Sequence, residues 1–584
     1  MGRVIEDLRL KRRKIILLLL SLLLFCLARA ADVIQVDNIR PGMKGFGLTV
    51  FSGHKIERFE VEVLDVMHKI APKCDLILCR LSGANLEKTG VIAGMSGSPI
   101  YLEVGATHAS PLLAGAVAYA WGFSKEPIAG VTPINEMLEI WQEKRPGTNS
   151  GIGLEKNRST AFSPLPIPVA LSGFTPGLAD LIEPIMSKYG LVPIAASGRA
   201  RETDSAGLDS LLIPGAAIGV GLIDGDVRMS GIGTLTYRQG QKILAFGHPM
   251  LQAGSVKMPL VGGVIHSILP SLSVSFKFFS PTIPIGTLTQ DRLTGIAGTI
   301  GPVPEMTPVE VAINSRCTED TYHFRVAKHP TLLPILIPVG LSDIIFSTEG
   351  KLEDMTLSSQ MGITLDDTEN ITVHHVYTGE GLASRLFHNT SDELNALFEK
   401  RFPTPKLTRV VFKLKYVPGR KKLRIISARP DRLVAKPGDT ITVAMVLEDY
   451  AGKKTDRIIK TVLPKTTPAG RLTLVISPWD SLQQREALRA PGVASPNTMK
   501  GLKKLLENTG RENELVVAGF IPKPGITMRD KELPAPPPSL RSTIMASGST
   551  EPVLATNESP LFEQSFYFDA VISGTYELRL EVHR

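Results

Sequence analysis

The chain has 584 residues, enough for about three or four domains that each bury a core of their own. Hydrophobic residues make up 43% of it and charged residues 21%, which excludes a disordered polar chain. The formal net charge is +8, but residues 1–30 carry seven Lys or Arg against two acids, so only +3 remains for the rest. Because no aromatic-rich basic patch accompanies this charge, nucleic-acid binding is not supported.

The N-terminus has the pattern of a secretory signal peptide. A basic stretch from Arg9 to Lys14 precedes an uncharged apolar run from Ile15 to Leu27, and Ala28-Arg29-Ala30 then supplies an A-x-A cleavage site. The apolar run is shorter than the roughly 20 residues that span a bilayer, although an uncleaved anchor stays open as the alternative. We expect cleavage before Ala31, export to the periplasm, cell envelope or extracellular space, and no stable membrane span thereafter.

Three cysteines remain after cleavage, namely Cys74, Cys79 and Cys317. Cys74 and Cys79 lie five positions apart in an apolar run, so in a strand they face opposite sides and cannot bond to each other. Buried free thiols are the simplest interpretation, and no zinc-binding spacing exists. We expect neither a metal nor a cofactor.

The heptapeptide Gly94-Met95-Ser96-Gly97-Ser98-Pro99-Ile100 places a serine between glycines and before a proline. Chymotrypsin-like proteases present their nucleophile in this way. Glycines at 94 and 97 allow backbone conformations in which successive N–H groups form one small pocket for an oxyanion. The expected donors are the N–H groups of Gly94 and Ser96. A plain tight turn between two strands is the alternative.

Two apolar segments, Leu113–Gly122 and Pro127–Ile134, follow the heptapeptide and are predicted to be strands. In chymotrypsin-like enzymes the strand after the nucleophile ends in an aromatic-glycine pair that lines the substrate cleft, and Trp121-Gly122 resembles that pair. Gly90, six residues before Ser96, falls where the floor of the specificity pocket would be and carries no charge. The alternative for Trp121 is an ordinary core or rim aromatic.

Short β-like runs predict a mainly β protein. Residues 31–140 have enough strands for one six-stranded barrel, 141–209 form a connector with one helix near 177–189, and 210–345 are a candidate second barrel. Residues 346–424 form a β-rich extension with a helix at about 391–401, and 425–584 a β-sandwich-like accessory domain that closes with a hairpin around Ser573-Gly574. The predicted fold is a chymotrypsin-like double β-barrel followed by this accessory domain.

A serine nucleophile needs a general base, and His248 is the best placed of the 11 histidines. It sits in a glycine-proline turn at the end of an apolar strand, a position that projects an imidazole into a cleft. Other histidines have plainer explanations. His374 and His375, for example, point to opposite faces of a predicted strand.

Several motifs together resemble the sporulation stage IV protein B family of serine peptidases. They are Gly94–Pro99, Gly231–Tyr237, Phe246-Gly247-His248, and the stretch from Ile285-Gly286 to Gly295–Gly298. The resemblance covers roughly residues 40–135 and 210–305 and implies Ser96 as nucleophile and His248 as base. The family places its histidine segment first, whereas here the serine segment comes first. Such a permutation preserves a site that geometry defines rather than chain order.

The third member of a triad is less clear. The family's aspartate lies about fifteen residues before the serine, where this chain has Leu81-Ser82-Gly83-Ala84 and no carboxylate. Asp291 in the histidine segment is the preferred candidate and Asp75 the reserve. Alternatively, Asp291 pairs with Arg292 or caps a turn. A Ser–His dyad also stays open.

These observations predict a secreted serine endopeptidase that performs limited proteolysis of a protein substrate in the cell envelope, including itself. The alternative is a catalytically inactive envelope protein that keeps the protease fold as a binding or adhesion scaffold.

Overall fold

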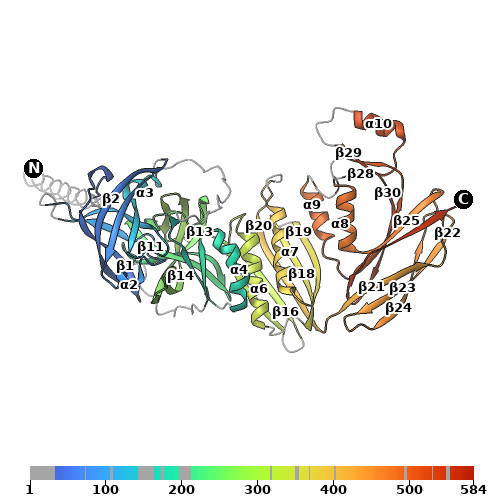
Figure 1. The fold of residues 1–584 in the computed structure, drawn as a ribbon, viewed down its shortest axis with the longest axis horizontal. Coiled ribbons are helices and arrows are strands. Elements are labelled where there is room, and N and C mark those ends of the chain that lie inside the picture. The colour runs from blue at the N-terminus through green and yellow to red at the C-terminus, as the bar shows by residue number, and fades with distance from the viewer. Residues whose placement is uncertain are drawn as a thin grey trace, which may run out of the picture. The chain divides into compact units, whose positions relative to one another are not determined.

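A computed structural model defines the fold (Figure 1). It describes residues 33–583 except 73, 106–109, 143–162, 173–175, 196–211, 316–318, 349–353, 367–368, 400–402, 492, 494–495, 497, 529–530 and 547–552. The predicted signal peptide and Cys317 lie outside the described residues. No helix in the described ranges is long and apolar enough to cross a membrane.

The chain divides into two compact units. The first contains the residues up to Ala170, Ile185–Gly221 and Ser230–Pro304, and the second contains Leu171–Pro184, Leu222–Met229 and Glu305–Arg584. Both candidate catalytic residues, Ser96 and His248, fall in the first unit.

The first unit begins with a closed antiparallel ring of six strands, as predicted for residues 31–140. Its order is β4-β1-β2-β3-β6-β5, and pairing of β4 with β5 closes it. The strands are β1 (Lys44–Ser52), β2 (Lys55–Ala71), β3 (Cys74–Ser82), β4 (Pro99–Leu102), β5 (Leu112–Ala120) and β6 (Ile128–Pro133). Alternate residues such as Phe59, Val61 and Val63 of β2 are buried inside, because successive strand side chains point to opposite faces.

A second six-stranded ring follows, and apart from the adjoining ends of β10 and β11 within Leu222–Met229 it lies in the same unit. Its order is β10-β13-β14-β15-β12-β11, with β10 also paired to β11. The strands are β10 (Ala217–Gly225), β11 (Arg228–Gln239), β12 (Lys242–Ala245), β13 (Gly254–Leu269), β14 (Phe276–Arg292) and β15 (Gly295–Ile300). The predicted second barrel is therefore present, but its predicted end at residue 345 lies too far along the chain. β16 (Met306–Asn314), β17 (Glu319–Ala327) and α6 (Leu333–Thr348) belong to the second unit instead.

The region between the rings contains β7 (Ser163–Pro164), β8 (Ile167–Ser172), α4 (Pro176–Lys188) and β9 (Leu191–Ala195). The helix predicted near 177–189 is confirmed as α4. β7 pairs with the end of β5, Pro164 opposite Tyr119, and the Leu165 N–H donates to Ala118 O at 2.9 Å. This short strand therefore covers part of the β5 edge that the ring itself leaves open.

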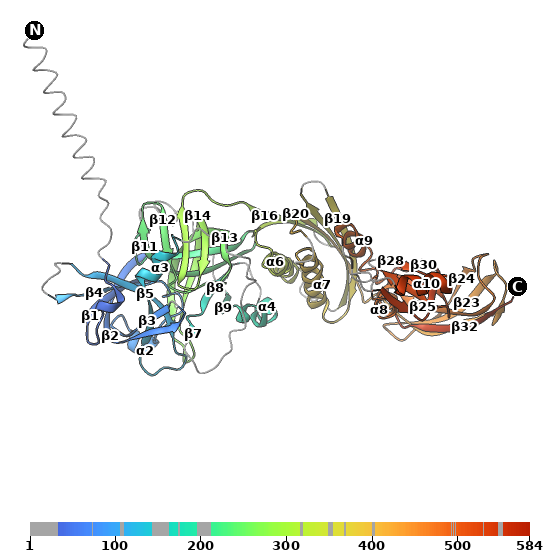
Figure 2. The same cartoon turned by 90° about the horizontal axis from the view of Figure 1, so that it is seen from above.

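The second unit starts with a sheet in the order β19-β18-β20-β16-β17, where β18 is Met355–Leu365, β19 Glu369–Thr378 and β20 Leu407–Pro418. Helices α6 and α7 (Leu382–Leu397) pack together on one side of it (Figure 2). The helix predicted at 391–401 thus begins nine residues earlier. Its buried residues Leu382, Leu386, Thr390 and Leu394 recur every four positions, so Ser391 lies inside the helix rather than at its start.

Two sheets that share one hydrophobic core form most of the remainder of the second unit, the arrangement expected of the predicted β-sandwich. One sheet contains β24 (Lys454–Val462), β23 (Thr440–Asp449), β21 (Lys422–Pro430) and β31 (Val571–Ser573). The other contains β22 (Val434–Ala435), β32 (Tyr576–Val582), β25 (Gly470–Pro478), β26 (Glu514–Ile521) and β30 (Ser559–Tyr567). The predicted closing hairpin is wrong, because β31 and β32 join different sheets and the Ser573-Gly574 turn crosses between them.

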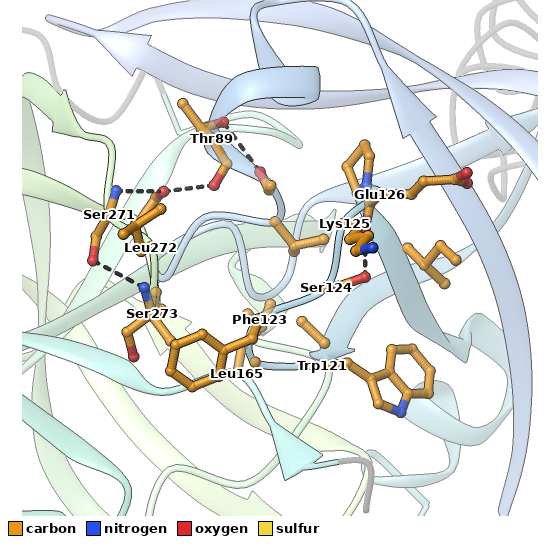
Figure 3. Close-up of a pocket in the computed structure, with 18 of the residues that line it drawn as sticks. Thr89, Trp121, Phe123, Ser124, Lys125, Glu126, Leu165, Ser271, Leu272 and Ser273 are labelled. Carbon is orange, nitrogen blue, oxygen red and sulfur yellow. Dashed lines mark hydrogen bonds between the residues drawn. The ribbon is translucent and has the colours of Figure 1, made fainter. Parts of the chain in front are cut away.

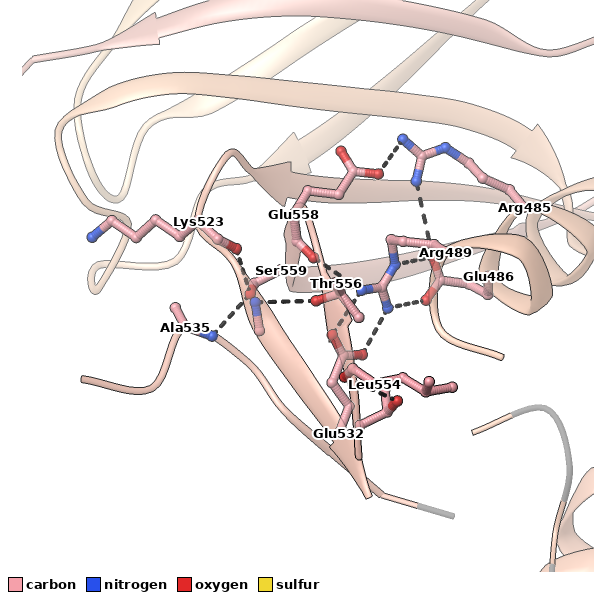
Figure 4. A network of polar contacts seen from close by, with 12 residues as sticks. Arg485, Glu486, Arg489, Lys523, Glu532, Ala535, Leu554, Thr556, Glu558 and Ser559 are labelled. Atoms are coloured by element: carbon pink, nitrogen blue, oxygen red, sulfur yellow. Dashed lines mark hydrogen bonds and ion pairs between the residues drawn. The ribbon is translucent and has the colours of Figure 1, made fainter. Parts of the chain in front are cut away.

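A buried arginine ties helix α8 (Trp479–Arg489) to the small sheet beside the sandwich (Figure 4). Arg489 forms paired hydrogen bonds with Glu486, at 2.9 and 2.5 Å, and with Glu532 of β28 (Lys531–Leu533), both at 2.7 Å. Its side chain is only 6% exposed, so both carboxylates are needed to offset the desolvation of the guanidinium.

Candidate active site

Ser96 lies in a tight turn between α2 (Leu86–Thr89) and β4, on the first ring. Gly94 and Gly97 adopt φ angles of +97° and +93°, which an L side chain rarely adopts, so the glycines of the heptapeptide are required by the backbone. Ser96 is fully buried, and its Oγ has no hydrogen-bond partner among the described residues. A buried hydroxyl without a partner is costly, which singles this serine out.

Hydrogen bonds fix every peptide group of the turn. The carbonyls of residues 93 to 97 accept from Lys277 N (3.2 Å), Thr234 Oγ1 (3.0 Å), Ser98 N (2.9 Å), Thr234 N (2.7 Å) and Thr236 Oγ1 (2.7 Å), in chain order. The N–H groups of Met95, Gly97 and Ser98 donate to Ile92 O, Val117 O and Met95 O. Among the described residues, only the N–H groups of Gly94 and Ser96 within this stretch have no acceptor.

These are the two donors that the sequence analysis assigned to the oxyanion hole. They are two residues apart, and the peptide groups that carry them are held rigidly through their carbonyls. Such preorganised donors can stabilise a developing negative charge without reorganising during the reaction.

The turn that carries His248 packs directly against the Ser96 turn. A Cβ on Gly97 would lie 2.0 Å from Thr234 O and 2.4 Å from Phe246 N, so the two backbones approach as closely as only glycine permits. Gly247 packs in turn against Val117 of β5, and its carbonyl accepts from Thr132 Oγ1 at 2.6 Å. The serine and histidine segments, about 150 residues apart in the chain, therefore meet at one place.

The histidine turn has a strained backbone. Phe246 and Gly247 have φ angles of +71° and +69°, and Phe246 is a bulky residue for which a positive φ is unfavourable. Its ring fills the space over Gly233, where a Cβ would come within 2.6 Å of the ring. Gly233, part of the Gly231–Tyr237 motif, is thus explained by the space that the histidine turn needs.

His248 is fully buried, and its Nδ1–H donates to the carbonyl of Pro249 at 2.8 Å. Because Nδ1 carries the proton, Nε2 is the basic nitrogen of the neutral ring. Ser96 Oγ forms no hydrogen bond with this ring. The structure therefore brings the two turns into contact without the direct Ser–His hydrogen bond that a working nucleophile requires.

Asp291 does not take the place of a triad acid. Its buried carboxylate accepts the backbone N–H groups of Met250 and Leu251, both at 2.8 Å, and of Ala253 at 3.2 Å, rather than a proton from His248. Burial raises its pKa, while these N–H groups act in the opposite direction. The carboxylate caps the loop that follows the histidine, which is the alternative that the sequence left open.

The reserve candidate, Asp75, forms its hydrogen bonds with groups other than the His248 imidazole. Its carboxylate accepts from Lys69 N at 2.7 Å and contacts His68 Nδ1 at 3.1 Å. A backbone carbonyl, that of Pro249, therefore occupies the position that an acid occupies in a triad.

A pocket of about 260 Å³ lies on the first unit, and neither Ser96 nor His248 is among the described residues that line it (Figure 3). The predicted cleft residues Trp121 and Gly122 both line it, and so does Gly90, the predicted pocket floor. Phe123, at 77% exposed, and Leu272, at 94% exposed, also belong to its lining. Figure 3 shows Trp121 and Phe123, from the loop after β5, on one side and the loop before β14 on the other.

Lys277 is a functional candidate that the sequence reasoning missed. It is fully buried on β14, and its Nζ donates to Thr49 Oγ1 at 2.8 Å. Burial lowers its pKa to about 7. The sequence signal for it was its place among Phe276, Phe278 and Phe279. A charged side chain is rarely buried, so a lysine within an aromatic strand stands out.

The two described cysteines are buried free thiols, as predicted. Burial raises the pKa of Cys79 to about 12 and is the main cause that raises the pKa of Cys74 to about 11, so both stay protonated at neutral pH. In the described part of the chain, no group of three His, Cys, Asp or Glu is arranged to hold a metal ion.

Comparison with family models, with curated proteins and with solved structures finds no match for this chain.

Proposed function

We propose that this protein is a serine endopeptidase with Ser96 as nucleophile and His248 as general base. The observation that carries the proposal is the pair of N–H groups, those of Gly94 and Ser96, that lack acceptors in a turn whose other peptide groups are hydrogen-bonded. A plain structural turn has no reason to leave two alternate donors unsatisfied beside a buried hydroxyl, since each costs about 1–3 kcal/mol.

In the reaction, His248 Nε2 removes the proton from Ser96 Oγ while Oγ attacks the scissile carbonyl carbon. The N–H groups of Gly94 and Ser96 receive the oxyanion of the tetrahedral intermediate. The C–N bond then breaks, and the imidazolium gives its proton to the leaving amine. Water, activated by the same Nε2, hydrolyses the acyl-enzyme and restores the free serine.

The hydrogen bond from His248 Nδ1 to a backbone carbonyl, rather than to Asp291 or Asp75, supports a dyad. The Pro249 carbonyl fixes the tautomer and orientation of the ring, which is part of what a triad aspartate does. A neutral carbonyl stabilises the imidazolium formed during the reaction less than a carboxylate in that position would. We therefore expect slow turnover, which suits limited cleavage of a protein partner better than general digestion.

The two six-stranded rings support a chymotrypsin-like arrangement in which the serine half precedes the histidine half. The resemblance to the sporulation stage IV protein B family leads to the same residues. With the predicted signal peptide, it makes a protein substrate in the cell envelope our preferred target.

A non-catalytic scaffold is the second candidate. It is favoured by the full burial of Ser96 and by the absence of a hydrogen bond from its Oγ to His248. Under the enzyme hypothesis, the site must open and the imidazole must move onto Oγ when substrate binds. Apo enzymes often have such loose catalytic geometry.

A fluorophosphonate probe distinguishes the two candidates, because it forms an O–P bond only with an activated serine and releases fluoride. We expect the mature protein to be labelled at Ser96, as located by peptide mass spectrometry. Labelling is lost in Ser96→Ala and slowed at least about 100-fold in His248→Ala. Ser255→Ala, an exposed serine of β13, is the matched control and retains the wild-type rate. Folded wild-type protein that never labels at Ser96 would favour the scaffold.

A further inference from the structure

The buried Lys277 lies behind the Ser96 turn and takes no part in the mechanism above. It reaches from β14 of the second ring to β1 of the first, where Nζ donates to Thr49 Oγ1 at 2.8 Å. Burial alone accounts for its lowered pKa, with no carboxylate contributing. A cation buried without a counter-charge is expensive, so its retention calls for an explanation.

Lys277 contacts the turn through its backbone and its side chain. Its N–H donates to Ala93 O at 3.2 Å and so holds the Ala93–Gly94 peptide, the one that carries the Gly94 N–H. Its methylenes lie against Gly94, where a Cβ would be 3.1 Å from Lys277 Cδ and 3.3 Å from Cγ. The position of the first oxyanion donor is therefore set from behind by this side chain.

A chain of hydroxyls connects the Lys277 Nζ to the same turn. Thr49 Oγ1 lies 3.4 Å from Thr234 Oγ1, which donates to Gly94 O at 3.0 Å. The Gly94 carbonyl belongs to the peptide between the two donor residues. Lys277 thus contacts the peptide before Gly94 directly and the peptide after it through Thr49 and Thr234.

We propose that Lys277 is a positioning residue of the oxyanion site, holding Gly94 so that its N–H and that of Ser96 keep their places. This inference rests on the proposed function. The apolar length of the side chain fills the space behind the turn, and the amine anchors the far end at Thr49. An apolar side chain of similar length fills the same space but cannot hold the hydroxyl chain.

Burying this lysine lowers the stability of the fold. Its pKa of about 7 in the folded state lies below the ordinary 10.5, so between these values the unfolded chain binds more protons and the folded state is disfavoured as pH falls. The residues that connect the Lys277 side chain to β1, the Ser96 turn and β11 are Thr49, Gly94 and Thr234, none of them ionisable. On β13, which pairs with β14, the ionisable residues are the exposed Lys257 and His266, which is hydrogen-bonded to Ser280.

The test is Lys277→Met in the full mature protein, with fluorophosphonate labelling as the readout. We expect the maximal labelling rate to fall at least about tenfold while the half-saturating probe concentration stays the same, because the donors act on the transition state. At pH 7 we also expect the midpoint of thermal unfolding to rise by roughly 5 °C, and this gain to disappear near pH 10.5. Substitution of a residue with only a structural role would not raise the unfolding temperature and lower the labelling rate at the same time.

Thr49→Val supplies a second, milder test, because it breaks the hydroxyl chain and keeps the lysine. We expect it to slow labelling about threefold. Lys257→Met, at an exposed lysine of β13, is the matched control and changes neither quantity. If folded Lys277→Met labels at the wild-type rate, the positioning role is overturned and the peptidase proposal stays intact. If Lys277→Met does not fold, a wild-type labelling rate in folded Thr49→Val has the same meaning. A wild-type protein that never labels at Ser96 overturns both.

Discussion

The close approach of the serine and histidine turns can be tested at Gly97. An alanine there places its Cβ 2.0 Å from Thr234 O and 2.4 Å from Phe246 N, both backbone atoms that cannot rotate away. The turn must therefore shift, which weakens three hydrogen bonds, namely Gly97 N to Val117 O, Thr234 N to Ser96 O and Thr236 Oγ1 to Gly97 O. At about 1 kcal/mol each, they represent about 3 kcal/mol of unfolding free energy.

Gly240→Ala is the matched control for this substitution. Gly240 lies in the hairpin between β11 and β12 with φ +60°, and a Cβ there meets no atom within 4 Å. It therefore shares the conformational cost of about 1–2 kcal/mol for an L residue at positive φ, without the overlap. The difference between the two variants isolates the contact between the turns.

The assay is urea unfolding combined with hydrogen exchange of the peptide that covers residues 91–100, which reports on the first unit alone. We expect Gly97→Ala to be about 3 kcal/mol less stable than Gly240→Ala, to exchange faster in that peptide and to lose Ser96 labelling. If the two variants agree within about 1 kcal/mol, the backbones of the two turns are not in the contact described here.

Three further predictions concern buried charges. Asp291→Asn replaces a carboxylate that binds three N–H groups with an amide that has one acceptor oxygen. We expect the unfolding free energy to fall by about 2 kcal/mol and hydrogen exchange to become faster across residues 250–253. Unchanged exchange there would contradict the capping role. His375 lies between Glu393 and Glu512 at 2.6 and 2.7 Å, and its pKa is raised to about 10, so its contribution to stability is complete below about pH 6.5 and is lost as the pH rises through 10. The unfolding free energy of the second unit should fall between pH 6 and 10 by at most about 1.4 kcal/mol per pH unit, and His375→Gln should remove this slope. Arg489→Met removes the paired hydrogen bonds to Glu532 and leaves Glu486 only the 3.9 Å contact with Arg485, so it should cost about 3 kcal/mol in urea unfolding. The more exposed Arg485→Met should cost less than about 1 kcal/mol.

Local pattern was sufficient where a strand or helix buries one face against its immediate neighbours. The predicted strand Pro127–Ile134 matches β6 within one residue at each end, and the predicted strand Leu113–Gly122 matches β5 within one residue at its start but runs two residues too far. His374 and His375 do face opposite sides of β19, one exposed and the other buried. In each of these cases the spacing of buried residues along the element determines where it lies and which way its side chains face.

Pairings between distant segments could not be predicted in this way. β16 has the same pattern as the barrel strands before it, but it pairs in parallel with β20, about a hundred residues later, and so belongs to the second unit. The alternation of apolar and polar residues in Thr307–Asn314 does not indicate which strand β16 pairs with. The same limit applies to the Ser573-Gly574 turn, whose glycine marks a reversal without saying that the strands enter different sheets.

Side-chain roles at the candidate site divide in a similar manner. The need for glycine at 94 and 97 was predictable because positive φ angles and, at Gly97, close approach restrict those positions to few residue types. Asp291 was not, because a carboxylate serves an imidazole and a row of backbone N–H groups equally well. Lys277 was missed because its aromatic neighbours mark a strand with buried residues but do not show which face points inward, and the assembled rings settle this.

The groups that fix the Ser96 turn come largely from the other ring. Thr234, Thr236 and Lys277 all belong to the second ring, and they hold four of the five carbonyls between residues 93 and 97. A partly folded chain in which only the first ring has formed lacks these restraints and cannot keep its two donors in register. If the proposed function holds, activity therefore depends on assembly of both rings, and a chain that is still folding has Ser96 but no formed oxyanion site.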